Sequence, residues 1–442
     1  MPRRVLVVGA GFAGLYAARG LERLLPGDTA ELTLVSPRNY FLYSPLLPDV
    51  TAGIVEPRHI AVPLHQVLRR TRIVIGRVTT VDVAARTLQV DTGETLGWDR
   101  LVLTPGSVTR QFDVPGVPER AHGVKTLGEA RYLRDHLLGE LDRADALPPG
   151  SDGERRERLG VVAVGAGYSS TEVVAQLQRM VDAVSARWER VRPGDVRWTL
   201  VDVADSVLPE LGPRLGRAAL DVLRRRGVDV RLGVTVASAD DHAVTLTDGA
   251  VVPARTLVWG AGVVANPLVG SLGLPTEKGR LVVDARLRVP GTPGVWAAGD
   301  AAAVPDLTAD QGAGGRARVT PPTAQHALRQ GCALARNVAA SLGVGRSRDY
   351  RHHDLGLVAD LGGRDALARP LGIPLTGLPA KVVTRGYHLF ALPDTASAVR
   401  VAGDWLLSAV LPVQGAAITE IPDEDALIPQ AQHVTPPRAP AG

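Results

Sequence analysis

The chain contains two glycine-rich segments, each of which follows a β-rich apolar run and continues into a helical pattern. The first is VLVVGAGFAGL, from Val5 to Leu15, and the second is LGVVAVGAGYSSTE, from Leu159 to Glu172. In a strand–turn–helix unit, the first glycine permits a tight turn and the second lets the backbone approach phosphates at the helix N-terminus. One such motif is weak evidence. Two of them, with Gly9 and Gly165 156 residues apart, predict two dinucleotide sites, of which the usual pair is a flavin and a nicotinamide.

The composition is that of an ordinary globular protein. Of the 442 residues, 22% are charged and 45% are hydrophobic, and the length allows about two to three domains. The formal net charge of +4 and the isoelectric point near 9.4 are compatible with an acidic partner such as a membrane surface. Basic residues are not clustered among aromatic ones, so no nucleic-acid binding is predicted.

Cys332 is the only cysteine, and we expect a buried, inert thiol. An intrachain disulfide is therefore impossible, and electron transfer through paired active-site cysteines is excluded, as is a cysteine-rich zinc site. The histidines at His59, His65, His352 and His353 show no spacing with carboxylates that is typical of a metal site, so no metal is predicted.

The pattern of apolar runs predicts an α/β fold with two Rossmann-like dinucleotide-binding domains, beginning with a helix over about 13–25 and a strand at 31–36. We expect a discontinuous FAD-binding domain with an inserted NAD-binding domain. The predicted boundaries are 1–123 for the first part of the FAD-binding domain, 124–260 for the NAD-binding domain, 261–345 for the second part of the FAD-binding domain, and 346–442 for a C-terminal segment. Residues 147–158, LPPGSDGERRER, predict a loop before the second glycine-rich turn.

The N-terminal MPRR and the apolar residues after it resemble the start of a signal peptide. Because these apolar residues run directly into the first glycine-rich turn, we interpret them as the first strand and expect a cytoplasmic protein. No apolar run reaches the length of about 18 residues that spans a bilayer, so no transmembrane helix is predicted.

Beyond Asp349, short apolar stretches carry aromatic and basic residues at their edges, as in AKVVTRGYHLFAL and AVRVAGDWLLSAVLPV. Two interpretations fit this pattern. The elements are amphipathic and lie in a membrane interface, or they are helices that cap a domain or form a dimer contact. The tail from Ile421 onward is acidic and then proline-rich, which predicts disorder.

Residues at strand ends select the nucleotide in this kind of fold. At the first site the second strand ends at Ser36, whose hydroxyl can bind a ribose, and nearby Arg38 can reach a pyrophosphate or stack on adenine. Further on, GVWAAGD ends at Asp300, which is placed to bind a flavin ribityl chain or a water on the pyrophosphate.

At the second site the corresponding strand ends at Asp202. A carboxylate there accepts from both ribose hydroxyls and repels a 2′-phosphate, so NADH is favoured over NADPH; the alternative is a solvated strand end. Glu172 follows the second turn and begins its helix. It is either a partner of the helix dipole or a contact to the nicotinamide ribose or amide, and both interpretations stay open.

Taken together, these segments resemble the two-dinucleotide flavoprotein family and, within it, the type II NADH dehydrogenases, which are single-subunit NADH:quinone oxidoreductases. The resemblance covers roughly residues 4–342. The most specific match is SPRNYFLYSPLLPDVTAGIVEPRHI at 36–60, which is similar to the family's segment beside the isoalloxazine. Further matches are TLVWGAGVVANPL at 256–268 and PPTAQHALRQG at 321–331.

The resemblance implies that FAD and NADH are the cofactors and that hydride passes from NADH to FAD. Two electrons then pass to a quinone or another small electron acceptor, without proton pumping. It implies peripheral association with the inner face of the cell membrane, and a homodimer is a further expectation. Two alternatives stay open: a soluble NADH-dependent flavoprotein reductase for a non-quinone acceptor, and a non-catalytic NADH- and FAD-binding sensor or interaction protein.

The candidate site residues come from the two turns and from the segments that match the family. Those assigned to cofactor binding are Gly9, Gly11, Phe12, Ala13, Gly14, Ser36, Pro37, Arg38, Ser44, Pro45, Gly106, Gly165, Gly167, Tyr168, Asp202, Gly260, Gly262, Gly299, Asp300, Ala324 and Gln325. Those assigned to catalysis are Glu172, Gln325 and Arg329. In the family, Gln325 matches a residue of the quinone site.

The chain departs from the family pattern at three positions. Ser170 replaces the third glycine of the second turn, which should tighten helix–strand packing without abolishing nucleotide binding. Pro105 stands where the family usually has a small or hydroxyl residue. Arg329 stands where many members carry a second glutamine, and it would bind a quinone carbonyl or indicate an anionic acceptor. Next to Gln325, His326 is a proton relay to the reduced quinone or a structural residue, of which we favour the second.

Overall fold

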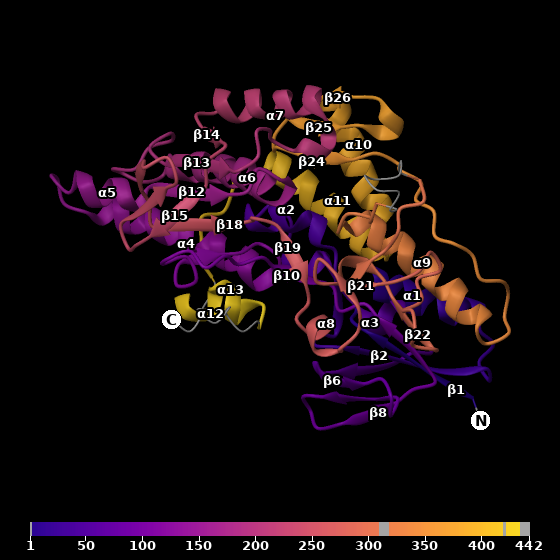
Figure 1. The fold of residues 1–442 in the computed structure, drawn as a ribbon. Helices are drawn as coiled ribbons and strands as arrows, with labels where there is room; N and C mark the ends of the chain where they lie inside the picture. The colour runs from indigo at the N-terminus through magenta and orange to yellow at the C-terminus, as the bar shows by residue number, and fades with distance from the viewer. Residues whose placement is uncertain (1, 309–317, 419–420, 434–442) are drawn as a thin grey trace. The chain divides into compact units, whose positions relative to one another are not determined.

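The computed structural model describes residues 2–308, 318–418 and 421–433 (Figure 1). The chain divides into two compact units, each made of separate stretches of sequence. The first unit comprises Met1–Leu42, Ala61–Val108 and Val263–His353, and the second comprises Tyr43–Ile60, Thr109–Gly262 and Asp354–Gly442. Each unit contains a parallel five-stranded sheet, so the predicted α/β fold with two Rossmann-like domains is confirmed. The four predicted domain ranges stay a prediction.

The sheet of the first unit has the strand order β22-β9-β1-β2-β5, with every neighbouring pair parallel. Its strands are β1 (Arg3–Val8), β2 (Ala30–Ser36), β5 (Arg72–Ile75), β9 (Arg100–Leu103) and β22 (Val295–Ala297). Helix α1 (Phe12–Leu24) packs against α9 (Ala324–Ala340). A side chain at Gly331 would overlap the backbone of Ala13, so this glycine permits the close approach of the two helices.

The smaller elements of the first unit are mostly antiparallel ribbons. The short strands of this unit are β3 (Tyr40–Leu42), β4 (Ala61–Pro63), β6 (Val78–Asp82), β7 (Thr87–Val90), β8 (Thr95–Gly97), β10 (Ser107–Thr109), β19 (Val263–Ala265), β20 (Thr276–Glu277), β21 (Arg280–Val282) and β23 (Ala302–Ala303). Its short helices include α3 (Leu64–Val67), α8 (Leu268–Ser271) and η4 (Gly299–Ala301). The turn DTG at 91–93 joins β7 and β8, two neighbouring strands of one ribbon.

The sheet of the second unit has the order β11-β18-β12-β13-β14, again with parallel neighbours. Its strands are β11 (Ala121–His122), β12 (Gly160–Val164), β13 (Arg197–Asp202), β14 (Asp229–Leu232) and β18 (Thr256–Trp259), and its longer helices are α4 (Leu127–Ala146), α6 (Tyr168–Ser185) and α7 (Pro213–Arg225). Every residue of β12 is buried, because helices cover both faces of a parallel sheet. A small antiparallel sheet holds β15 (Val236–Ala239), β16 (Ala243–Leu246) and β17 (Val251–Pro253).

The loop predicted at residues 147–158 is wrong for its second half, where α5 (Asp152–Arg158) forms a helix. Two ion pairs join neighbouring turns of α5: Asp152 to Arg155 at 3.3 Å and Glu154 to Arg158 at 2.6 Å. Acidic residues near the N-terminus and arginines in the last turn also complement the helix dipole. These charges, which suggested a solvated loop, stabilise the helix instead.

The C-terminal residues belong to the second unit. An antiparallel sheet of β24 (Val358–Asp360), β25 (Ala366–Ala368) and β26 (Leu375–Thr376) packs against α10 (Gly377–Ala391), which in turn contacts α11 (Thr395–Val410). Further short helices of this unit are α2 (Leu47–Thr51), η1 (Ser44–Leu46), η2 (Pro57–His59), η3 (Pro209–Leu211) and η5 (Pro370–Gly372). None of the helices among the described residues is long and apolar enough to cross a membrane.

The prediction of disorder from Ile421 onward is wrong for residues 421–433. Two short helices, α12 (Asp423–Ala426) and α13 (Ile428–Ala431), form there and pack on α4. The side chain of Ile428 is 1% exposed, so an apolar anchor outweighs the acidic composition. The proline-rich residues 434–442 lie outside the described residues.

Candidate active site

The first glycine-rich turn is packed on one side and open on the other. A Cβ on Gly9, which has φ +94°, would overlap the carbonyl of Thr104, and a Cβ on Gly14 would overlap Gly9. By contrast, nothing lies within 4 Å of the Cβ position of Gly11. Gly11 is also the N-cap of α1 and offers no side-chain cap, so the first N–H groups of the helix are left for another acceptor. The turn therefore has the form of a phosphate cradle.

The second turn repeats this arrangement. Gly165, with φ +100°, packs on the carbonyl of Gly260, whereas Gly167 has open space at its Cβ position and caps α6 without a side chain. The Oγ of Ser170 donates to the carbonyl of Val164 at 3.0 Å. It occupies the space that a Cβ on Gly260 would need. The serine that replaces the third glycine is thus accommodated by Gly260, the residue that follows the neighbouring strand β18.

Two hydroxyl groups beside the second turn suit a polar ligand. The Tyr168 hydroxyl and the Oγ1 of Thr171 are buried and have no hydrogen-bond partner among the described residues. Burial raises the pKa of Tyr168, as does the negative charge of Glu210, so the phenol is a donor at neutral pH. Buried polar groups normally have partners, and a bound dinucleotide would provide them.

The carboxylate of Asp202 is held beside the second turn. Its Oδ2 accepts from the backbone N–H of Ala166 at 2.5 Å, and its Oδ1 accepts from that of Ala204 at 2.8 Å. Ala166 is the middle residue of the Gly-x-Gly turn, so the end of β13 and the phosphate cradle are joined directly. This geometry suits a carboxylate that binds ribose hydroxyls.

The corresponding position of the first unit is less polar. Ser36 is buried, and its Oγ accepts from the backbone N–H of Arg38 at 3.3 Å. The Arg38 guanidinium lies 5.9 Å from the ring centroid of Tyr40, a cation–π contact. Pro37 lies between them in the chain, and Phe12 packs edge-on against Phe41 with ring centroids 4.9 Å apart.

Asp300 lies in η4 at the carboxyl end of β22. Its Oδ2 accepts from the hydroxyl of Ser107 at 2.6 Å. The N–H of Gly299 donates to Oε1 of Gln330 at 2.7 Å, and the Nε2 of Gln330 donates to Thr320 at 2.9 Å. The sequence analysis missed Ser107 and Gln330, because nothing in either residue's local pattern distinguishes it from an ordinary polar residue.

The start of α9 brings the predicted acceptor residues together. Thr323 caps the helix by accepting from the N–H of His326 at 3.3 Å, and Ala324 is the first helical residue. Gln325 and Arg329 are four residues apart and so share a face. The NH1 of Arg329 donates to Oε1 of Gln325 at 3.1 Å.

A cluster of aromatic side chains lies next to these residues. The Nδ1 of His326 is 3.1 Å from the hydroxyl of Tyr350, which is 3.2 Å from Nδ1 of His352. The two imidazole rings stack with centroids 3.8 Å apart, and burial raises the pKa of Tyr350 to about 12. His326 is therefore tightly packed, which favours the structural interpretation.

Glu172 lies in the second turn of α6, because the helix begins at Tyr168. The expectation that Glu172 begins the helix is wrong, and with it the dipole interpretation loses its basis. Its Oε1 accepts from the backbone N–H of Asp360 at 2.7 Å. Burial raises the pKa of Glu172 well above its usual range, and the nearby negative charges of Asp360 and Asp49 add to this effect. Burial therefore favours the neutral form of this carboxyl group, whereas the hydrogen bond from Asp360 favours the charged form.

Sequence reasoning missed the buried polar network around Glu172. Lys381 Nζ lies 2.5 and 2.6 Å from the two carboxylate oxygens of Asp360. Asp49, 5% exposed, accepts from Nε2 of Gln176 at 2.9 Å and from Nε1 of Trp405 at 2.8 Å. These residues are far apart in sequence, and only long-range packing brings them together.

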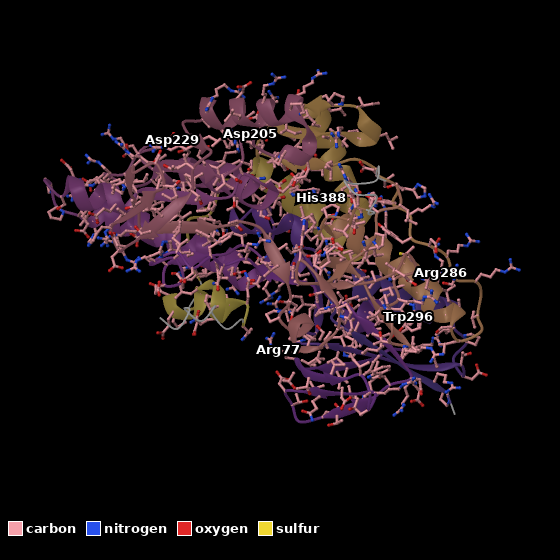
Figure 2. The ribbon with its side chains drawn as sticks, in the orientation of Figure 1. Arg77, Asp205, Asp229, Arg286, Trp296 and His388 are labelled. Carbon is pink, nitrogen blue, oxygen red and sulfur yellow. The ribbon has the colours of Figure 1, made fainter. Side chains whose placement is uncertain are left out.

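His388, labelled in Figure 2, lies on α10 in the same unit. Its Nδ1 is 3.0 Å from the hydroxyl of Tyr43. Burial lowers the pKa of His388 to about 4, with partial opposition from the negative charge of Asp360. The imidazole is therefore neutral near pH 7, and it extends the set of buried titratable groups in this unit.

The remaining predicted residues are distributed over both units. Ser44 and Pro45 lie in η1 of the second unit. Gly106 and Gly262 have φ of +76° and +90°, with open space at their Cβ positions. Glu172 belongs to the second unit, and Gln325 and Arg329 belong to the first. The catalytic roles of these three residues, Glu172 at the nicotinamide and Gln325 and Arg329 at the electron acceptor, stay a prediction.

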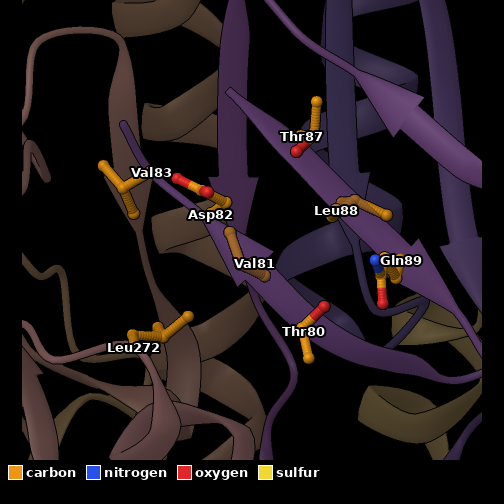
Figure 3. A pocket seen from close by; sticks show the side chains of 8 residues that line it. All are labelled: Thr80, Val81, Asp82, Val83, Thr87, Leu88, Gln89 and Leu272. Carbon is orange, nitrogen blue, oxygen red and sulfur yellow. The ribbon is translucent and has the colours of Figure 1, made fainter. Parts of the chain in front are cut away.

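A shallow hollow of about 500 Å³ lies elsewhere in the first unit. Figure 3 shows its lining, which consists of Thr80, Val81, Asp82, Val83, Thr87, Leu88, Gln89 and Leu272. None of these is a predicted site residue, and we assign the hollow no role. Across the described ranges, no three His, Cys, Asp or Glu side chains are grouped to hold a metal ion. Cys332 is half-buried on α9, and burial raises its pKa, so the thiol is a weak nucleophile.

Comparison with known proteins identifies the family. The profile of the pyridine nucleotide-disulphide oxidoreductases matches residues 3–331. The type II NADH:quinone oxidoreductase NdhA of Mycobacterium tuberculosis is 32% identical over 427 residues, which cover 92% of this chain and 87% of the relative. The chain belongs to the type II NADH:quinone oxidoreductase family.

Other type II NADH:quinone oxidoreductases agree with this assignment. That of Staphylococcus aureus is 26% identical over 407 residues, with 91% of this chain and 96% of the relative covered. Among solved structures, NDH2 from Plasmodium falciparum in complex with NADH matches with a TM-score of 0.85 at 18% identity, covering 94% of this chain and 100% of that one. The sulfide:quinone oxidoreductase of Aquifex aeolicus matches with a TM-score of 0.68 at 19% identity, covering 93% and 96%. These structural matches concern the fold, and the family assignment confirms the resemblance inferred from the motifs.

Proposed function

We propose that the chain is an FAD-dependent NADH:quinone oxidoreductase that does not pump protons. The observation that carries this proposal is the pair of open turns at Gly11 and Gly167, one in each unit of a chain from this family. When bound, FAD supplies the redox centre that takes hydride from NADH and passes two electrons to the quinone. The protein supplies binding, orientation and control of protons.

Each nucleotide has a set of residues to hold it. In the first unit, the N–H groups that follow Gly11 would bind the FAD pyrophosphate, and Ser36 and Asp300 would orient its sugar-like hydroxyl groups. In the second unit, the N–H groups after Gly167 would bind the NADH pyrophosphate. Asp202, held in place by Ala166, would accept from the adenosine ribose.

Gln325 and Arg329 are the proposed acceptor residues. Arg329 donates to the amide oxygen of Gln325 at 3.1 Å, so the two side chains lie together at the start of α9. A guanidinium and an amide N–H₂ are both donors, and they suit the oxygen atoms of a quinone, which gain negative charge on reduction. Glu172, whose pKa is raised by burial, would form a hydrogen bond with the nicotinamide ribose or amide.

We also propose peripheral association with the inner face of the cell membrane. The large apolar side chains of α10 and α11 that are more than half exposed are Leu378, Val382, Phe390, Val399, Leu406, Leu407 and Val410. Two amphipathic helices with such a face suit a membrane interface. A homodimer contact is the competing use of the same surface.

Vesicle binding tests the membrane proposal. Phe390, 84% exposed on α10, is replaced by serine, and Val251→Ser on β17 is the control, because Val251 is also exposed but lies outside the two helices. We expect Phe390→Ser to reduce co-sedimentation with phospholipid vesicles and the control to leave it unchanged. If Phe390→Ser instead dissociates a dimer and leaves vesicle binding intact, the surface is a dimer contact.

Anaerobic stopped-flow spectroscopy tests the activity. The purified flavoprotein is mixed with NADH and then with a menaquinone analogue or with buffer. Fast bleaching of the flavin followed by fast quinone-dependent reoxidation is the expected result. Slow reoxidation by quinone would overturn the quinone assignment and favour a reductase with another acceptor. If NADH does not bleach the flavin, the chain is a sensor or interaction protein.

A further inference from the structure

Residues 421–433, which we call the C-terminal clamp, pack on the rest of the second unit through buried apolar side chains and hydrogen bonds. Figure 1 shows its helices α12 and α13 beside α4. Ala426 and Ile428 are buried. The carboxylate of Asp423 accepts from the hydroxyl of Tyr132 on α4 at 2.7 Å. A short segment with so many anchors has a defined position, although its composition is acidic.

Gln432 makes the most specific contacts of the clamp. Its Nε2 donates to Oγ1 of Thr109 and to Oε1 of Glu129, both at 2.7 Å, and its Oε1 accepts from the backbone N–H of Thr109 at 2.8 Å. Glu129 is 1% exposed and Gln432 is 9% exposed. Both amide atoms of Gln432 are therefore used, and water does not compete for them.

Glu129 is itself immobilised at the start of α4. Its Oε2 accepts from the backbone N–H groups of Lys125 and Thr126, and its own N–H donates to Oγ1 of Thr126 in a capping box. Only Oε1 is left to face the clamp. Through these hydrogen bonds Gln432 links Thr109 to the capped N-terminus of α4.

Thr109 occupies a special place in the chain, because the sequence passes from the first unit to the second at Val108–Thr109. Two residues earlier, the hydroxyl of Ser107 binds Asp300 at 2.6 Å. One residue later, the N–H of Arg110 donates to the carbonyl of Gly262 at 3.0 Å. This crossover strand, residues 107–110, therefore contacts two predicted cofactor-binding residues, Asp300 and Gly262.

We propose that Gln432 is a positioning residue: through it, the C-terminal clamp holds the crossover strand and so keeps Asp300 oriented for the flavin nucleotide. The effect of the clamp on the strand is independent of the electron acceptor. Its effect on the flavin rests on the proposed function, because it requires FAD beside Asp300.

Hydrogen–deuterium exchange of the full-length flavoprotein tests the contact directly. In Gln432→Ala the amide of Thr109 loses its acceptor and Glu129 loses its donor, so exchange in a peptide covering 104–112 should be about tenfold faster. Gln430→Ala is the matched control, because Gln430 is an exposed glutamine in α13, two residues before Gln432, and it should exchange like wild type. Wild-type protection in Gln432→Ala would overturn the proposal.

Swapping the acid and the amide between positions 129 and 432 tests whether Gln432 acts through its hydrogen bonds or only through packing. Gln432→Glu alone places two carboxylates against each other, and Glu129→Gln alone places two amides there. The double variant Glu129→Gln/Gln432→Glu again pairs a donor with an acceptor, the Thr109 hydroxyl can donate to the new carboxylate, and glutamine is accepted in a capping box. Each single change should accelerate exchange at 104–112, and the double variant should restore most of the protection. Failure of this rescue would overturn the assigned hydrogen bonds.

The rate of flavin release, followed by the fluorescence of free FAD, tests the consequence for the site. Release should be about tenfold faster in Gln432→Ala and recover in the double variant. If exchange at 104–112 rises while flavin release stays at the wild-type rate, the clamp holds the strand without positioning Asp300, and that part of the proposal is wrong. Failure of the proposed function would be seen separately, as an absence of NADH-dependent bleaching in the wild-type protein.

Discussion

At the second glycine-rich turn, the hydroxyl of Ser170 lies in space that is open because Gly260 has no side chain. Ser170 projects from the first turn of α6, donates to Val164 and occupies the position of a missing Cβ on Gly260. In a turn with three glycines, the third glycine on the helix provides this space, whereas here Gly260, the residue after β18, provides it. The two residues are therefore expected to depend on each other energetically.

Gly260→Ala should destabilise the second unit by about 1–3 kcal/mol, because the added methyl group overpacks the contact with Ser170. The double variant Ser170→Gly/Gly260→Ala should recover most of this loss. Chemical denaturation of each variant, followed by tryptophan fluorescence, gives the coupling energy. Additive effects of the two substitutions would show that the residues are independent.

Asp202→Ser should reduce the preference for NADH over NADPH, measured as the ratio of kcat/KM for the two nucleotides, by about tenfold or more. The substitution removes the charge that repels a 2′-phosphate. Asp205→Ser is the control, because Asp205 is an exposed acid three residues further along, labelled in Figure 2. An unchanged ratio in Asp202→Ser would remove Asp202 from this role.

Arg329→Gln should slow reoxidation of the flavin by quinone about tenfold, because a charged donor to the reduced oxygen is replaced by a neutral one. Reduction of the flavin by NADH should be unaffected. Stopped-flow measurement of the two half-reactions separates these effects, with Arg336→Gln on the exposed side of the same helix as the control. Wild-type rates in both half-reactions would exclude Arg329 as an acceptor residue.

Stability should fall as the pH falls from about 6.5 to 4, because His388 is buried in its neutral form. Its folded pKa of about 4 lies below the ordinary value near 6.5, so the unfolded state binds more protons in this window. The expected slope is up to about 1.4 kcal/mol per pH unit for this residue. His388→Gln should show a shallower dependence in urea unfolding at several pH values, and exposed His353→Gln should follow wild type.

Lys381→Met should destabilise the second unit by about 3–5 kcal/mol, because it leaves the buried carboxylate of Asp360 without its cation. The pair is buried, with an Nζ–Oδ1 distance of 2.5 Å. Adding Asp360→Asn removes the uncompensated charge and should recover much of the loss. Equal destabilisation in the single and double variants would show that packing, rather than charge, sets the cost.

Elements with a strong local pattern were predicted well. The helix expected at about 13–25 runs from Phe12 to Leu24, and the strand expected at 31–36 runs from Ala30 to Ser36. Two errors in the predicted secondary structure occurred where charge dominated the composition. In α5 the charges form ion pairs within the helix, and at 421–433 buried Ile428 and Gln432 anchor a segment that composition alone indicates to be disordered.

The sequence by itself determined the two glycine-rich turns, the carboxylate at the end of β13 and the family, because each depends on residues that are close together in the chain. A turn that requires φ of +94° or +100° needs a glycine, and this need can be seen in a few letters. Only the tertiary structure decided which side chains lie around these turns. The contact of Gln432 with Thr109, that of Trp405 with Asp49 and that of Glu172 with Asp360 join residues 323, 356 and 188 positions apart. Burial sets the strength of such contacts and raises the pKa of Glu172, and burial is a property of the packed chain rather than of any segment.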